Sequence, residues 1–322
     1  MRRDRRFFSH GARDAVWYGA WFVLGCALWV FFLNGGDIPF DFHDWAEVNA
    51  PRLAFVQDAL RKGVFPLHMP DASALRGVTD RYFSLPDVFF TPQLFLMKWL
   101  SVGEFVLAHF LILYAAGYIG LVRLSRRLKL SPAAFAVLFL IYNGNGHLLS
   151  HVAVGHATWG GTLLFSWFML WVYELYEEGE PPWGWPLKMG GLLFAIFLQG
   201  SFHQFVWCLL FLCAAVLTFW TRRGPDWARW KAIFSAGVCS VGLSAVRILP
   251  VAIQLDGFDD DFLGGYRSLR QLVRAFLIHV APADALDRTV TGGTLGWWEY
   301  DMYIGFALAG LLLILTVLRA GE

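Results

Sequence analysis

Four side chains with acid–base chemistry follow shortly after the first long apolar stretch of the sequence. The segment Gly36–Trp45 contains Asp37, Asp41, His43 and Asp44. A carboxylate can accept the proton of a hydroxyl group when it lies within hydrogen-bond reach and has a suitable pKa. We therefore predict that Asp44, or Asp41 or Asp37 in its place, is a catalytic base, and that His43 supports it and binds the substrate or its phosphate. The alternative is a solvated loop whose acids cap the following helix.

Three histidines form a second group, His147, His151 and His156. The first two are one helical turn apart, but His156 would lie opposite His147 on a continuous helix. Joint metal binding would therefore require a break in the helix, for which Gly155 is the candidate. Cysteine or an interposed glutamate, which complete common zinc sites, is missing nearby. We predict that these histidines bind a phosphate or sugar, with hydrogen bonds to each other's loops as the alternative. A divalent metal is left open but not predicted.

Arginines form the third group. Arg267, Arg270 and Arg274 share one helix face, and Arg247 lies inside an apolar run. Guanidinium groups match phosphate oxygens in geometry and charge. We predict that these four residues and Glu299 bind the substrate and its phosphate. The alternatives are ion pairs with neighbouring acids and, for Arg247, a pair with Glu299 or a side chain that reaches the membrane surface.

The elements that must position these groups are membrane helices. The chain is 57% hydrophobic and 16% charged over 322 residues, which is far from the balance of a soluble domain. The expected fold is an all-α polytopic membrane protein with about eight spans. Three spans are Ala15–Leu33, Phe105–Val122 and Met302–Leu318, and further ones are Pro132–Asn143, Ala157–Tyr173, Met189–Leu198, Phe205–Trp220 and Ala232–Leu255.

Residues 1–322 are predicted to form a single transmembrane domain with two long external loops, 34–101 and 256–301. Lysines and arginines gather before the first span and in 123–129 and 222–231, so the positive-inside rule predicts cytoplasmic termini and periplasmic or extracellular loops. Trp45–Leu60 has the pattern of an amphipathic interfacial helix. The sequence has no Asn-x-Ser/Thr site, which is compatible with a bacterial inner membrane.

A series of short motifs resembles the GT-C class of membrane glycosyltransferases. The motifs are Asp44–Arg52, Gly63–Pro70, Ala116–Tyr118, Arg123–Leu130, Asn143–His147, Gly155–Trp159 and Trp298–Gly305. The resemblance implies transfer of a hexose or pentose from a polyprenyl-phosphate carrier to an acceptor outside the cytoplasm. It also implies that the first-loop acid, Asp44 or else Asp41 or Asp37, is the base. The chain is short for this class, so it is expected to be a minimal enzyme, a fragment or an inactive relative.

Two other functions fit the same pattern. The chain is alternatively a non-catalytic membrane subunit of a larger complex, or a transporter of a lipid-linked sugar. Membrane lipids and the polyprenyl-phosphate carrier are the expected partners, together with other membrane proteins under the second hypothesis. The four cysteines lie in apolar runs without CxxC spacing, which predicts neither a disulfide framework nor a zinc site. No cofactor and no nucleic-acid partner is predicted.

Overall fold

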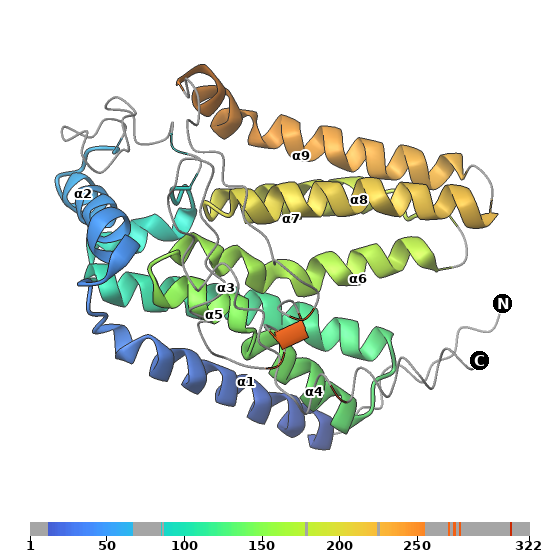
Figure 1. Ribbon diagram of the computed structural model, residues 1–322, viewed down its shortest axis with the longest axis horizontal. Helices are drawn as coiled ribbons and strands as arrows, with labels where there is room; N and C mark the ends of the chain where they lie inside the picture. Colours follow the sequence, from blue (N-terminus) through green and yellow to red (C-terminus); the bar gives the residue numbers. More distant parts are fainter. Residues whose placement is uncertain are drawn as a thin grey trace.

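The computed structural model describes residues 12–66, 85, 87–177, 180–223 and 226–254, and isolated positions at 270, 273, 274, 277 and 310. Every regular element within these ranges is helical (Figure 1). In chain order the helices are α1 (Ala12–Phe32), η2 (Asn34–Gly36), η3 (Trp45–Asn49), α2 (Ala50–Arg61), η6 (Pro92–Lys98), α3 (Val102–Arg127), α4 (Pro132–Asn143), α5 (Gly146–Ala153), η7 (Ala157–Leu164), α6 (Phe165–Tyr176), α7 (Trp185–Leu198), α8 (Phe202–Arg223) and α9 (Trp227–Gln254).

Four helical stretches are long and apolar enough to cross a membrane. They are Asp14–Phe32, Val102–Arg127, Pro132–Ala153 and Trp227–Ile253. The apolar parts of α7 and α8 are shorter. The chain is therefore an α-helical integral membrane protein. The predicted span Met302–Leu318 and most of the predicted loop 256–301 lie outside the described residues, so the count of eight spans stays a prediction.

Local sequence explains where several helices begin and end. The Ser131 hydroxyl accepts a hydrogen bond from the Ala134 N–H, and Pro132 occupies the first turn of α4; both features favour a helix start. Ser101 and Glu104 form a reciprocal capping box at the start of α3. The predicted spans Met189–Leu198 and Phe205–Trp220 are separate helices, α7 and α8, and Gly200 has a φ of 77° in the turn between them.

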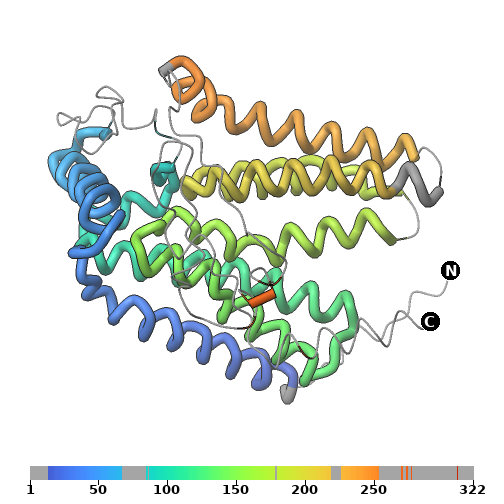
Figure 2. Tube along the Cα trace, in the orientation of Figure 1, coloured from blue at the N-terminus to red at the C-terminus, as the bar shows by residue number. Residues whose placement is uncertain are grey.

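The long helices run roughly side by side, with α2 across one end of the bundle (Figure 2). α7 packs along α9, while α3 packs on α1, α6 and η7. Aromatic rings fill the core between α1 and α3, where Trp29 lies 5.1 Å from Phe110 between ring centroids. At the α2 end, α3 begins directly beside the loop that follows α1. A Cβ on Gly103 would lie only 2.0 Å from the Gly36 carbonyl oxygen, so this close approach requires glycine.

Candidate functional site

Asp44 occupies the N-cap position of η3 but does not act as a cap. Within the described residues its side chain makes no capping hydrogen bond. One carboxylate oxygen instead lies 3.2 Å from Nδ1 of His43, and the other lies 3.0 Å from Nε2 of His156. The Asp44 side chain is only 12% exposed. The helix-capping alternative therefore does not describe this acid, whose two oxygens both face imidazole rings.

The backbone beside Asp44 is strained. His43 has a φ of 45°, which lies in the left-handed region that few residues other than glycine adopt, although histidine is among the more tolerant ones. Such conformations cost free energy and persist only where surrounding contacts impose them. Here the conformation accompanies a His43 ring that lies against the carboxylate of the next residue.

Contacts between η3 and the α5–η7 connection explain how His156 reaches Asp44. The Trp45 indole N–H donates to the Val152 carbonyl at 3.0 Å, and the Asn49 amide donates to the Gly155 carbonyl at 2.5 Å. Gly155 has a φ of 106°, and a Cβ there would lie 2.2 Å from the Trp45 backbone nitrogen. Only glycine permits both the conformation and the contact.

Gly155 also supplies the helix break that joint use of the three histidines required. α5 ends at Ala153, and His156 turns back so that its ring centroid lies 5.0 Å from that of His151. His151 is fully buried and its Nδ1 lies 2.8 Å from the His147 carbonyl. His147 and His151 lie 4.3 Å apart between ring centroids.

An aromatic stack extends the histidine group toward α8. The centroid of the Trp159 ring lies 3.7 Å from that of His151 and 5.5 Å from that of Trp207. The centroid of the His203 ring lies 6.2 Å from that of Trp159. We call His43, Asp44, His147, His151, His156, Trp159, His203 and Trp207 the histidine cluster. Sequence analysis did not place Trp159, His203 or Trp207 in the site, because they come from η7 and α8 and share no spacing with the first loop.

Three members of the histidine cluster have the geometry of metal ligands. One ligand atom from each of His43, Asp44 and His156 lies within 4.8 Å of the others. Imidazole nitrogen and carboxylate oxygen suit divalent transition metals such as Zn²⁺ or Mn²⁺. This set differs from the His147, His151 and His156 set that sequence spacing suggested. It was not foreseen, because its members come from two segments far apart in the chain.

Arg247, which was predicted to bind phosphate, lies elsewhere and is deeply buried. It is 1% exposed, and its guanidinium donates to the carbonyls of Leu85 at 2.7 Å and Val88 at 3.4 Å. Arg52, 2% exposed, pairs with Asp87 at 3.2 Å. Both arginines thus stabilise the same stretch of the first loop, from Leu85 to Val88. None of the contacts between described residues joins Arg247 to Asp44.

The remaining predicted residues are dispersed. Asp37 and Asp41 are exposed, as are Arg270 and Arg274, which occupy helical positions. Arg267 and Glu299 lie outside the described residues. The structure therefore brings Asp44 together with His43, His147, His151 and His156 and leaves the described arginines outside this group. Comparisons with protein-family models, curated proteins and solved structures found no match to the chain.

Proposed function

We propose that the protein is a GT-C-like glycosyltransferase whose catalytic base is Asp44. The observation that carries this proposal is the position of the Asp44 carboxylate, largely buried and held between two imidazole rings where the chain leaves its first membrane helix. Partly buried titratable groups with specific partners are frequent at functional sites. Under this proposal the chain has about eight spans, lies in a bacterial inner membrane and carries its site on the non-cytoplasmic side.

The proposed reaction is a single displacement at the anomeric carbon. The acceptor hydroxyl oxygen forms a bond to that carbon, and its proton passes to the Asp44 carboxylate. The bond from the anomeric carbon to the phosphate oxygen breaks, and its electron pair leaves with polyprenyl phosphate. His156, in the connection between α5 and η7, holds one carboxylate oxygen of Asp44 in place, and His43 contacts the other oxygen.

Arg247 has a different role here from the one that its sequence context suggested. Its hydrogen bonds to the Leu85 and Val88 carbonyls make it a positioning residue for the first loop. The developing charge on the leaving phosphate still needs a cationic partner. Arg267, Arg270 and Arg274 are the remaining predicted candidates for that partner, and a divalent ion held by His43, Asp44 and His156 is another.

The second candidate function is a non-catalytic subunit that retains the fold. The hydrogen bonds of Arg247 favour it, because this buried arginine donates to the Leu85 and Val88 carbonyls instead of lining a phosphate site beside Asp44. The two hypotheses differ in whether the protein catalyses transfer of the sugar from a lipid-linked donor. Purified protein in proteoliposomes should release polyprenyl phosphate from a panel of tritiated polyprenyl-phosphate hexoses and pentoses, in the presence of a membrane extract as acceptor source. No release with any donor would favour the subunit.

A further inference from the structure

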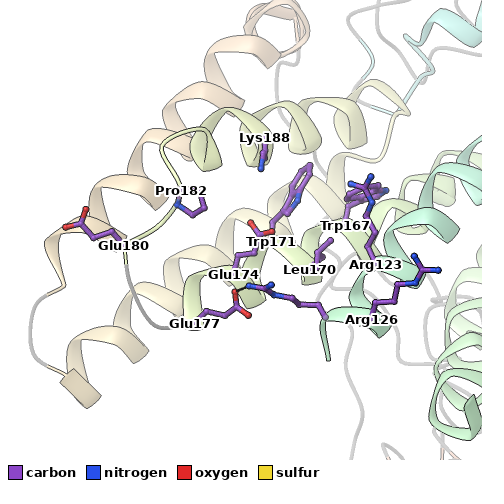
Figure 3. A pocket seen from close by; sticks show the side chains of 11 residues that line it. Arg123, Arg126, Trp167, Leu170, Trp171, Glu174, Glu177, Glu180, Pro182 and Lys188 are labelled. Carbon is purple, nitrogen blue, oxygen red and sulfur yellow. Dashed lines mark hydrogen bonds and ion pairs between the residues drawn. The ribbon is translucent and has the colours of Figure 1, made fainter. Parts of the chain in front are cut away.

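A charged cavity lies at the opposite end of the helix bundle from Asp44. It has a volume of about 460 Å³ and lies between the last turns of α3, one face of α6 and the start of α7 (Figure 3). α3 has 26 residues, so its ends are roughly 39 Å apart. Its first turn packs beside the acidic loop, whereas Arg123 and Arg126 in its last turns line the cavity. The cavity is therefore separate from the histidine cluster.

The walls of this cavity are fixed by hydrogen bonds. The Trp167 indole N–H donates to the Ala116 carbonyl at 2.7 Å, which ties α6 to α3. The Trp185 indole N–H donates to the Trp171 carbonyl at 2.8 Å, which ties α7 to α6. The Arg229 guanidinium donates to the Glu177 carbonyl at 2.7 Å and holds the end of this wall. The volume lies within the range of small-ligand sites.

Three acids also line the cavity, Glu174, Glu177 and Glu180, beside four basic residues, Arg123, Arg126, Arg127 and Lys188. Arg127 pairs with Glu177. Burial raises the pKa of the Glu174 carboxyl, while the nearby charges of Lys188 and Arg127 act in the opposite direction. Figure 3 shows Lys188 extending from α7 toward the side of the cavity where Trp171 lies.

Two of the arginines that line the cavity have their guanidinium groups over aromatic rings. That of Arg123 lies 4.9 Å from the Trp167 ring centroid, and that of Arg126 lies 5.2 Å from the Tyr18 ring centroid. No carboxylate in the described part of the chain forms an ion pair with either arginine. Guanidinium groups in this position can donate several N–H bonds to phosphate oxygens.

The surroundings of the cavity point to a membrane lipid as the source of that phosphate. Trp183 is 93% exposed and Leu187 is 62% exposed, and both adjoin residues that line the cavity. Tryptophan is enriched at the level of lipid headgroups. A site for a soluble phosphate ester would gain nothing from exposed apolar side chains beside it, whereas a lipid places acyl chains next to its phosphate.

We propose that this cavity binds the phosphate group of an anionic membrane lipid. Arg123 and Arg126 donate to its oxygens, and the Trp167 and Trp171 indoles flank the headgroup. The proposal does not rest on the transferase function, because the two sites lie at opposite ends of α3. A lipid held here would bridge α3, α6 and α7 and would stabilise their packing against one another.

The test is lipid binding to the full-length protein in detergent, followed by native mass spectrometry. Phosphatidylglycerol is titrated against phosphatidylcholine, for the wild type and for the double variant Arg123→Gln/Arg126→Gln. The matched control, Lys129→Gln/Lys231→Gln, removes equal charge from residues that do not line the cavity. We expect the cavity variant to lose phosphatidylglycerol affinity by at least about tenfold, since charged hydrogen bonds are strong, and the control to bind like the wild type.

Equal loss in both double variants would overturn the proposal, because binding would then follow overall charge. Unchanged binding in the cavity variant would overturn it as well. Displacement of phosphatidylglycerol by millimolar inorganic phosphate would overturn the lipid source in favour of a soluble phosphate ester. Arg123→Lys/Arg126→Lys serves as the second variant. It keeps the charge but loses the forked donor geometry, so we expect an intermediate affinity.

Discussion

The Asp44 carboxylate lies 3.0 Å from Nε2 of His156, and this contact joins the first loop to the connection between α5 and η7. Gly155 makes it possible, since the backbone of Asp44 and Trp45 lies directly against the place where a Cβ would be. A carboxylate placed between His156 and His43 has little freedom to rotate. The acid is thus held in one orientation, which under the proposed function places it for proton transfer from an acceptor hydroxyl.

Gly155→Ala should destabilise the protein, because the new methyl group meets the Trp45 nitrogen at 2.2 Å and φ is 106°. We expect the free energy of unfolding to fall by about 2 kcal/mol or more. Thermal unfolding in detergent, followed by circular dichroism, measures the change. The control is Gly191→Ala in α7, where a Cβ meets nothing within 4 Å; it should be neutral or slightly stabilising. Equal melting temperatures for the two variants would contradict the close packing.

Arg247→Gln should also destabilise the fold, because it removes a charged donor from the Leu85 and Val88 carbonyls. The expected loss is about 1.5–3 kcal/mol, visible as a lower melting temperature and faster proteolysis of the first loop. Arg61→Gln is the control, since that side chain is exposed and reaches only the Leu100 carbonyl at 3.4 Å. A variant that melts normally but has a raised KM for the lipid-linked donor would instead indicate that Arg247 binds the donor phosphate.

His156→Gln should lower activity by roughly ten- to hundredfold, the range expected for a partner that orients a reacting group. His203→Gln is the matched control, because His203 belongs to the same aromatic stack through Trp159, whereas His156 lies directly against the Asp44 carboxylate. Initial rates at saturating donor separate the two variants. If both lose activity equally, the stack matters only for packing, and the special role of His156 is wrong.

The predicted orientation can be tested with single cysteines in a background without the four native ones. Asp41→Cys and Lys129→Cys both replace exposed residues near opposite ends of the bundle. A membrane-impermeant maleimide should label Asp41→Cys on intact cells with a permeabilised outer membrane, and Lys129→Cys only after lysis. The reverse pattern would place the histidine cluster in the cytoplasm and remove the basis for an external transferase.

Local signals in the sequence predicted much of the helical framework. α4 has the predicted bounds Pro132–Asn143, because a serine cap, a first-turn proline and an apolar run all agree there. The amphipathic pattern of Trp45–Leu60 corresponds to η3 and α2, with Leu53 and Val56 buried. The predicted span Ala157–Tyr173 is instead η7 followed by α6, since apolar composition alone does not distinguish a tight 3₁₀ segment from an α-helix.

The site was less predictable, because it depends on contacts between distant segments. Sequence spacing grouped His156 with His147 and His151, but nothing in the spacing indicated that His156 would meet Asp44. Because Arg247 lies inside an apolar run, its charge requires a partner in the protein. Its actual partners are backbone carbonyls, which every residue has and which residue types therefore cannot identify.

The most direct measurement compares Asp44→Asn with Asp41→Asn in the proteoliposome transfer assay. Asparagine keeps the size of the Asp44 side chain but cannot accept the proton, so we expect sugar transfer to fall by about 10² to 10⁴-fold with the melting temperature little changed. Asp41, which is exposed, should tolerate the same change with activity near that of the wild type. Full activity in Asp44→Asn, or an equal loss in Asp41→Asn, would contradict the assignment of Asp44 as the base.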